Sequence, residues 1–295
     1  MKKILTAIAL IFSVILIGAS YSFCSDTLAF TGSDRTDLVS LSRSATVEII
    51  QEEASGQFVR LGTGFFIIDT MIVTCFHVAT EGKLIQLGTQ TLPGIGFIKK
   101  LHAVTVDQDT LTLRPLTQTS DEQRLYDFTI LLAPPSRRGN RFVLPVVQAD
   151  EHLIGQEVLF TGFPIGAQVA LTHLGFVSGF MREGGYGPNG LNGDVFCIQS
   201  SINGCNSGGA LLSMRGEVVG IISAKMFFYD SLMKSIDTEI STASQYGHIS
   251  LMGQDPLQRI REILLFLRVN SNLGIGYAIS SRHLLEYCDK NNLYR

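Results

Sequence analysis

Short apolar runs recur along the chain from about residue 45, and Gly, Asp and Asn separate them. The runs are rich in β-branched and aromatic residues, which favours strands over helices. The sequence predicts strands over residues 46–50, 64–68, 71–74, 128–132, 157–160, 170–172, 196–199, 210–212, 217–222 and 276–279. Many short strands with turn residues between them are typical of an all-β sandwich or barrel.

One helical pattern interrupts the strands near the C-terminus. Asp255 can cap a helix, and Pro256 suits the first helical position. Apolar residues then recur on one helical face, at Leu257, Ile260, Leu264 and Leu267. We expect an amphipathic helix that packs against the β domain, because its basic excess is too small to indicate a membrane surface.

The first 22 residues have the three-part layout of a secretory signal peptide. Lys2 and Lys3 precede an apolar stretch over residues 4–17, and small residues follow it. The stretch is shorter than the roughly 20 residues that a bilayer-spanning helix needs. We therefore expect a cleaved leader and an exported protein, periplasmic or secreted, with a membrane tether as the alternative if the leader is retained. Tyr21 and Phe23 disfavour a lipoprotein signal at Cys24.

Residues 23–44 are rich in Ser, Thr and Asp without sustained periodicity, which predicts a flexible linker. The composition of the whole chain, with 45% hydrophobic and 17% charged residues, is that of a globular protein. Its formal net charge is −3, and becomes −5 without Lys2 and Lys3. Neutralising phosphates requires a basic surface, so nucleic acid is excluded as the expected partner.

The cysteines are too few for a disulfide scaffold and have no metal-ligand spacing. They are Cys24, Cys75, Cys197, Cys205 and Cys288. Export permits a disulfide whose pairing the sequence leaves open, and buried free thiols fit equally well. We expect no metal and no cofactor.

A serine flanked by glycines lies between two apolar strands. Ser207 is followed by Gly208 and Gly209 and preceded by Gly204, within the segment over residues 202–212. Small neighbours let a substrate carbonyl approach the hydroxyl, and a tight loop can turn backbone N–H groups toward a developing oxyanion. The segment is a candidate nucleophile loop, with a plain hairpin turn as the alternative.

A histidine and an aspartate upstream complete a candidate catalytic set. His77 ends an apolar strand, as a positioned general base requires. Asp127 heads another, where a charge is costly unless a partner such as an imidazole N–H receives it. Taken singly, each could be structural. Their chain order with Ser207 is the His, Asp, Ser order of the chymotrypsin arrangement.

With these residues the sequence resembles a trypsin-like serine protease, and within that class it is similar to the HtrA/Deg proteases. The resemblance extends to residues 62–65, 162–166, 216–221 and 274–279. It implies an all-β fold of two six-stranded antiparallel β-barrels with an inserted helix near the C-terminus. The first barrel would span residues 45–148, and the second residues 149–295 with an insertion over 226–272.

The resemblance also implies an activity and the residues that perform it. His77 would be the general base, Asp127 its orienting partner and Ser207 the nucleophile of a serine endopeptidase that acts on proteins or peptides. By family register, Ser201 would lie at the base of the substrate pocket, with Ser223 and Lys225 in its wall. No acidic residue is expected there, which predicts uncharged, small aliphatic residues before the scissile bond.

The sequence departs from the family pattern in several places. Only about ten residues follow Leu285, so we expect no PDZ domain, and the 226–272 insertion is long. A homo-oligomer is implied by the resemblance alone.

A further departure concerns Cys205, which stands where the family has a glycine two residues before the nucleophile. A non-glycine residue at positive φ costs on the order of 1 to 3 kcal/mol. We expect the N–H groups of Cys205 and Ser207 to form the oxyanion hole after a substrate-driven rearrangement.

Three alternatives stay open at this point. The loop at Cys205 could be incompetent, which would make the protein a catalytically silent or latent binding or chaperone module. Cys205 could instead be a thiol nucleophile paired with His77, or it could form a disulfide with Cys75.

Overall fold

The computed structural model describes residues 35–80, 85–87, 90–92, 96–116, 121–137, 139, 141–182, 193–225, 230–243, 255–270 and 274–293. The predicted signal peptide lies outside these residues. No helix in the described part of the chain is long and apolar enough to cross a membrane.

The first half of the fold is an antiparallel sheet of seven strands, in the order β7-β6-β1-β2-β3-β9-β8. Its strands are β1 (Thr46–Glu52), β2 (Phe58–Ile68), β3 (Met71–Thr74), β6 (Leu101–Thr105), β7 (Thr110–Thr112), β8 (Arg114–Pro115) and β9 (Thr129–Leu132). The short strands β4 (Ile85–Leu87) and β5 (Gln90–Leu92) form a separate hairpin. Buried apolar residues such as Val47, Phe65 and Ile130 hold the sheet together.

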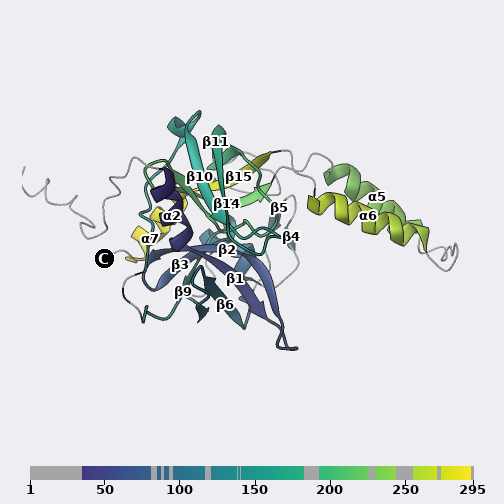
Figure 1. Ribbon diagram of the computed structural model, residues 1–295. Coiled ribbons are helices and arrows are strands. Elements are labelled where there is room, and N and C mark those ends of the chain that lie inside the picture. Colours follow the sequence, from purple (N-terminus) through teal and green to yellow (C-terminus); the bar gives the residue numbers. More distant parts are fainter. Residues whose placement is uncertain are drawn as a thin grey trace, which may run out of the picture. The chain divides into compact units, whose positions relative to one another are not determined.

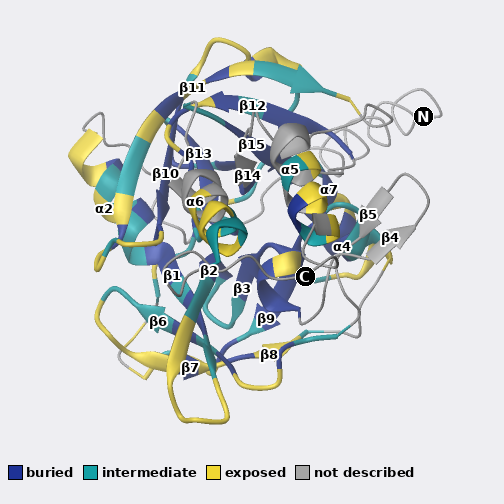
Figure 2. Ribbon diagram, turned by 90° about the vertical axis from the view of Figure 1, so that its right-hand side faces the viewer, coloured by how far each residue is buried: buried dark blue, intermediate teal, exposed yellow. Residues whose placement is uncertain are grey.

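The second half is a closed barrel in the order β10-β11-β12-β15-β14-β13. Its strands are β10 (Glu157–Gly162), β11 (Leu171–Met181), β12 (Val195–Gln199), β13 (Ala210–Ser213), β14 (Val218–Lys225) and β15 (Ile275–Ser280). Phe160, Phe196 and Ile222 belong to one buried cluster inside it. Figure 2 shows buried residues along the strands of both halves.

The expected architecture of two antiparallel barrels is confirmed, and all the predicted strands are present. The first sheet differs from the expectation because it has seven strands rather than six. Its extra members include very short ones such as β8 (Arg114–Pro115), which pairs with β9 at one edge. Such a short segment gives no apolar alternation from which a strand could be predicted.

The expected linker over residues 23–44 is wrong from Arg35 onward, because helix α2 (Arg35–Ala45) begins there. The helix lies against β10 (Figure 1), where Arg35 pairs with Glu157 at 2.6 Å. Ser42 and Thr161 share a buried hydrogen bond of 2.7 Å. The helix therefore buries Leu38 and small polar groups against the barrel, a contact that leaves little apolar periodicity in the sequence.

The 226–272 insertion contains two helices rather than the single one predicted. They are α5 (Asp230–Ala243) and α6 (Pro256–Asn270), which contact each other. Asp255 caps α6 as expected, since its Oδ1 accepts the N–H of Leu257 at 2.9 Å. Ile260 is 43% exposed, so the predicted apolar face does not pack on the barrel at this residue.

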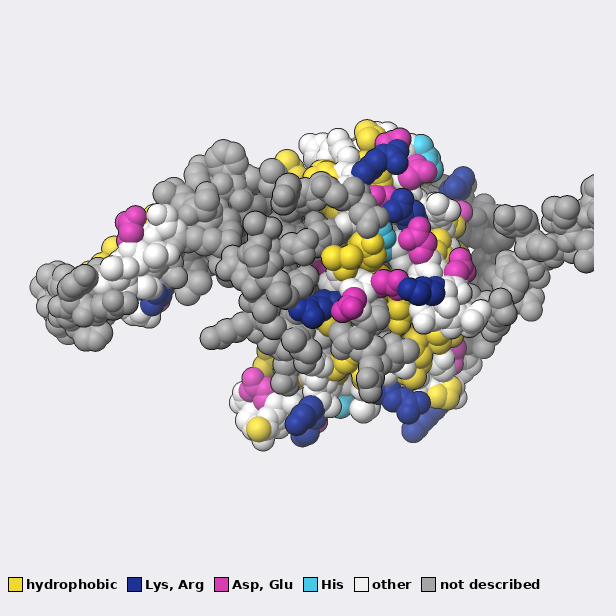
Figure 3. All heavy atoms as spheres, turned by 180° about the vertical axis from the view of Figure 1, so that it is seen from behind, with side chains coloured by type: hydrophobic (Ala, Val, Ile, Leu, Met, Phe, Trp, Pro, Cys, Tyr) yellow, Lys and Arg dark blue, Asp and Glu magenta, His cyan; other side chains and the backbone are white. Residues whose placement is uncertain are grey.

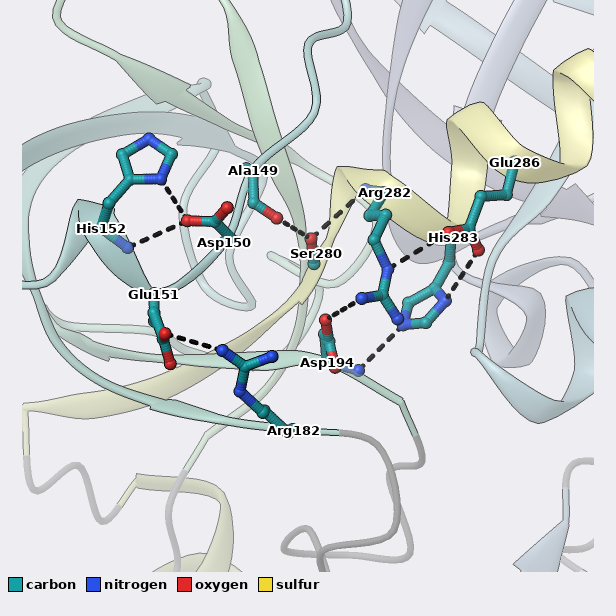
Figure 4. Close-up of polar contacts among 10 residues, drawn as sticks. All are labelled: Ala149, Asp150, Glu151, His152, Arg182, Asp194, Ser280, Arg282, His283 and Glu286. Atoms are coloured by element: carbon teal, nitrogen blue, oxygen red, sulfur yellow. Dashed lines mark hydrogen bonds and ion pairs between the residues drawn. The ribbon is translucent and has the colours of Figure 1, made fainter.

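The last helix, α7 (Ser281–Lys290), ties the second barrel to the loop before β9. Asp194 pairs with Arg282 at 2.8 Å, and its backbone N–H donates to Nε2 of His283 at 2.8 Å (Figure 4). The His283 ring stacks on Tyr126, with centroids 3.9 Å apart. This buried contact supports the residue directly before Asp127.

The surface is mixed in charge on the face that Figure 3 shows, where basic and acidic side chains lie next to one another. Ion pairs such as Arg182–Glu151, at 2.6 Å, join opposite charges elsewhere along the described chain. The described residues on that face therefore form no continuous basic patch of the kind that a nucleic acid would need.

Candidate active site

Hydrogen bonds from both the backbone N–H and the ring of His77 hold its imidazole in place. Strand β3 ends at Thr74, and the short helix α3 (Phe76–Ala79) turns the His77 side chain toward Asp127. Nδ1 lies 2.9 Å from both carboxylate oxygens, and the backbone N–H of His77 donates to Oδ1 at 3.1 Å. Because a carboxylate only accepts hydrogen bonds, Nδ1 carries the proton and Nε2 keeps its lone pair.

Asp127 is a buried charge with its hydrogen bonds satisfied. It is 7% exposed and has a φ of 51°, in the loop between α4 (Asp121–Leu125) and β9. Besides the two groups of His77, the hydroxyl of Ser223 donates to Oδ2 at 2.6 Å. These partners compensate for removing the carboxylate from water.

His77 and Asp127 shift each other's pKa. Burial alone lowers the pKa of His77, but the charge of Asp127 and the hydrogen bond to it outweigh burial and raise that pKa above its usual value. For Asp127, burial raises the pKa, but His77 and the hydroxyl of Ser223 lower it by more. The pKa of Asp127 therefore lies below its usual value. The site therefore favours an anionic Asp127 and makes His77 a stronger base.

Ser207 joins this pair through Ser223. The Ser207 hydroxyl donates to the backbone carbonyl of Ser223 at 2.8 Å, and the side chain of Ser223 in turn reaches Asp127. Ser223 thus contacts Ser207 through its backbone carbonyl and Asp127 through its side-chain hydroxyl. Transfer of the Ser207 proton to Nε2 of His77 requires the hydroxyl to rotate away from the Ser223 carbonyl.

Cys205 adopts the strained backbone that its position predicts, with a φ of 69°. Its carbonyl accepts the hydroxyl of Thr63 at 2.7 Å, and Thr63 also accepts the N–H of Phe163 at 3.1 Å. Thr63 lies in β2, so the first sheet holds the turn that contains Cys205 and Ser207 in place. None of the described residues accepts a hydrogen bond from the N–H of Cys205 or Ser207, as an oxyanion hole requires.

Close backbone packing surrounds Ser207. Asn206 is fully buried, and both atoms of its amide lack hydrogen-bond partners among the described residues. Gly208 has a φ of 91°, and a Cβ there would lie 2.0 Å from the carbonyl oxygen of Thr63. Position 208 therefore requires glycine, which lets the Ser207 turn lie directly against β2.

The three predicted pocket residues lie in different surroundings. Ser201 is exposed and follows shortly after β12. Lys225 is the last residue of β14, and the structure describes its backbone only. Ser223, predicted in the pocket wall, also donates a hydrogen bond from its hydroxyl to Asp127. That second role, and the contact of Thr63 with the turn, depend on long-range pairing that the sequence does not display.

The thiols near the site are not paired with each other. The four cysteines in the described part of the chain, Cys75, Cys197, Cys205 and Cys288, form no disulfide with one another. Burial raises the pKa of the Cys205 thiol. Because the thiolate is the reactive form, this disfavours Cys205 as the nucleophile.

Comparison with known proteins adds a family and a fold. Residues 62–221 match the family described as a trypsin-like peptidase domain. The solved Rv3671c protease from M. tuberculosis, in its active form, has 15% sequence identity and a TM-score of 0.51, covering 86% of this chain and 83% of that one. The HtrA-type protease AlgW, solved with a decapeptide, has 16% identity and a TM-score of 0.54, covering 86% of this chain and 66% of that one. No curated protein matches the sequence. At these identities the two structures support the fold alone.

Proposed function

The chain belongs to the trypsin-like peptidase family, and on that premise we propose that it is a serine endopeptidase with Ser207 as nucleophile, His77 as general base and Asp127 as the base's orienting partner. The observation that carries the proposal is the His77–Asp127 pair, in which Nδ1 lies 2.9 Å from both carboxylate oxygens and Nε2 is left to take the proton of Ser207. No cofactor takes part in this proposed chemistry.

The proposed reaction uses each group at a stated atom. When substrate binds, the Ser207 hydroxyl turns from the Ser223 carbonyl to Nε2 of His77, gives up its proton there and attacks the scissile carbonyl carbon. The N–H groups of Cys205 and Ser207 receive the developing oxyanion. Asp127 stabilises the imidazolium, which then protonates the leaving amine, and a water molecule hydrolyses the acyl-enzyme by the same route.

A fluorophosphonate probe tests this assignment without a known substrate. We expect the probe to label the protein at Ser207, and the Ser207→Ala variant to remain unlabelled. Ser178→Ala provides a matched control, because Ser178 is an exposed serine of β11. Equal labelling of the Ser207→Ala variant would contradict the assignment.

The second candidate function is a protease-like binding or chaperone module. Two observations favour it, the strained φ at Cys205 and the Ser207 hydroxyl that donates to Ser223. In that case the folded protein would bind unfolded polypeptide with Ser207 inert to the probe. Labelling in the presence of a peptide but not in its absence would instead identify a latent peptidase that substrate activates.

The proposal extends to substrate and location. We propose cleavage after uncharged, small aliphatic residues, because no acidic residue occupies the predicted pocket positions Ser201, Ser223 and Lys225. Dominant cleavage after Arg or Lys in a peptide-library digest would contradict this. We also propose that the protein is exported after loss of residues 1–22, which the N-terminus of the purified protein would test.

A further inference from the structure

Cys75 lies behind the catalytic carboxylate and has no part in the proposed hydrolysis. It is fully buried between β3 and α3, and its thiol donates to the carbonyl of Ile222 at 3.2 Å. Its sulfur, a ring nitrogen of His77 and a carboxylate oxygen of Asp127 all lie within 4.8 Å of one another. Three different metal-ligating atoms therefore lie close together inside the site.

We propose that Cys75, His77 and Asp127 form an inhibitory binding site for a zinc ion. A sulfur, a nitrogen and an oxygen donor make a set typical of Zn²⁺, whereas Mg²⁺ and Ca²⁺ prefer oxygen ligands. Three protein ligands leave the fourth tetrahedral position to water. Binding at this site is independent of whether the protein hydrolyses peptides, but the inhibition rests on the proposed function.

The geometry requires only local adjustment. Zinc bonds of roughly 2.0 to 2.3 Å place tetrahedral ligand atoms about 3.3 to 3.6 Å apart. The 2.9 Å separation of Nδ1 and the Asp127 oxygens would widen, and the sulfur would approach them. The His77 side chain is 38% exposed, so its outward rotation gives an ion a path to the buried Cys75 and Asp127.

The charges and protons balance. The Cys75 thiol donates a hydrogen bond to the carbonyl of Ile222 and therefore carries a proton, which ligation releases to solvent. The resulting thiolate and the carboxylate of Asp127 offset the two positive charges of the ion. A neutral imidazole completes the set, so the occupied site carries no net charge into the interior.

Occupancy of this site is incompatible with general-base catalysis by His77. In the metal-free protein Nδ1 carries the imidazole proton, which leaves the lone pair of Nε2 for the proton of Ser207. A zinc ion on Nδ1 obliges the single imidazole proton to reside on Nε2. No lone pair then faces Ser207, and the hydrogen bond between Asp127 and His77 is also lost.

Direct binding is tested in the Ser207→Ala background, where hydrolysis plays no part. Cd²⁺ serves as the probe, because a thiolate ligand produces a charge-transfer absorption band in the near ultraviolet. We expect one equivalent of Cd²⁺ to produce the band, Zn²⁺ to displace it, and Cys75→Ala to abolish it. Cys205→Ala is the matched control and should retain the band. A band that survives Cys75→Ala, or no band in the folded Ser207→Ala protein, would overturn the site.

Inhibition is measured with each variant compared to its own metal-free rate. We expect Zn²⁺ to inhibit hydrolysis reversibly, with activity restored by EDTA. Cys75→Ala should raise the half-inhibiting concentration by more than the roughly 10- to 100-fold that loss of an outer supporting contact costs. Equal sensitivity would show that Cys75 is not a ligand. If the protein hydrolyses nothing, the Cd²⁺ titration still decides the site, so failure of the proposed function is distinguishable from failure of this proposal.

Discussion

Replacing Thr63 by valine tests whether the first sheet holds the nucleophile turn in its working shape. Thr63 is fully buried in β2, and its hydroxyl both donates to the carbonyl of Cys205 and accepts the N–H of Phe163. Thr63→Val preserves the branched shape and removes only these two hydrogen bonds. Thr63→Ser is the matched control, because it keeps the hydroxyl and loses a methyl group.

The expected cost follows from the two lost contacts. The N–H of Phe163 belongs to a residue that is 7% exposed, and leaving a buried donor unsatisfied costs about 1 to 3 kcal/mol. The released carbonyl of Cys205 adds about 0.5 to 1.5 kcal/mol. We therefore expect the free energy of unfolding to fall by roughly 1.5 to 4.5 kcal/mol. Losing an oxyanion donor costs about 100-fold or more in kcat, so a misplaced Cys205 N–H should lower kcat by up to about 100-fold.

Urea unfolding followed by circular dichroism measures the first quantity, and steady-state peptide hydrolysis measures the second. The Thr63→Ser variant should keep most of its kcat and lose only the stability that a buried methyl group supplies. The reasoning would be refuted by a Thr63→Val protein within about 0.5 kcal/mol of the parent in stability and equal to it in kcat.

Three further predictions concern the same site. Cys205→Gly should be more stable than Cys205→Ala by about 1 kcal/mol. Positive φ costs an L-residue about 1 to 2 kcal/mol, and the greater flexibility of glycine in the unfolded chain offsets part of the gain from removing that strain. Urea denaturation that ranked alanine above glycine would contradict the strain. Gly208→Ala should abolish hydrolysis and lower the Tm, because its Cβ would lie 2.0 Å from the carbonyl oxygen of Thr63; a fully active variant would be inconsistent with this packing. The kcat/KM should rise with pH as His77 loses its proton, with a midpoint above the usual value of about 6.5. Asp127→Asn should lower that midpoint by removing the charge that raises the pKa of His77, and an unshifted midpoint would argue against His77 as the base.

The parts of the fold that follow from local apolar patterns could be predicted from the sequence. Strands such as Thr129–Leu132 are continuous apolar runs bounded by turn residues, and they form as predicted. Helix α2 was missed because it buries Leu38 and Ser42 on β10, which leaves only a weak apolar stripe. The strand over Thr110–Thr112 was missed because its outer residues are polar and exposed.

The candidate site likewise has residues that could be predicted from the sequence and contacts that could not. Serine, histidine and aspartate could be identified because each stands at the end of an apolar run or beside glycines, where its chemistry is unusual. The links between them could not, because they join distant segments. The contact of Thr63 with Cys205 spans 142 residues, and that of Ser223 with Asp127 spans 96. Cys75 likewise gains its significance only when folding brings it to Asp127.

The central claim is that Ser207 is the nucleophile of a peptidase, and hydrolysis of a peptide library by the purified protein beside its Ser207→Ala variant tests it most directly. The account predicts cleavage by the parent and a loss of about a millionfold in turnover in the variant, which brings it to background. Cleavage by both proteins at equal rates would contradict the account. So would a folded parent protein that neither cleaves the library nor reacts with a fluorophosphonate in the presence of peptide.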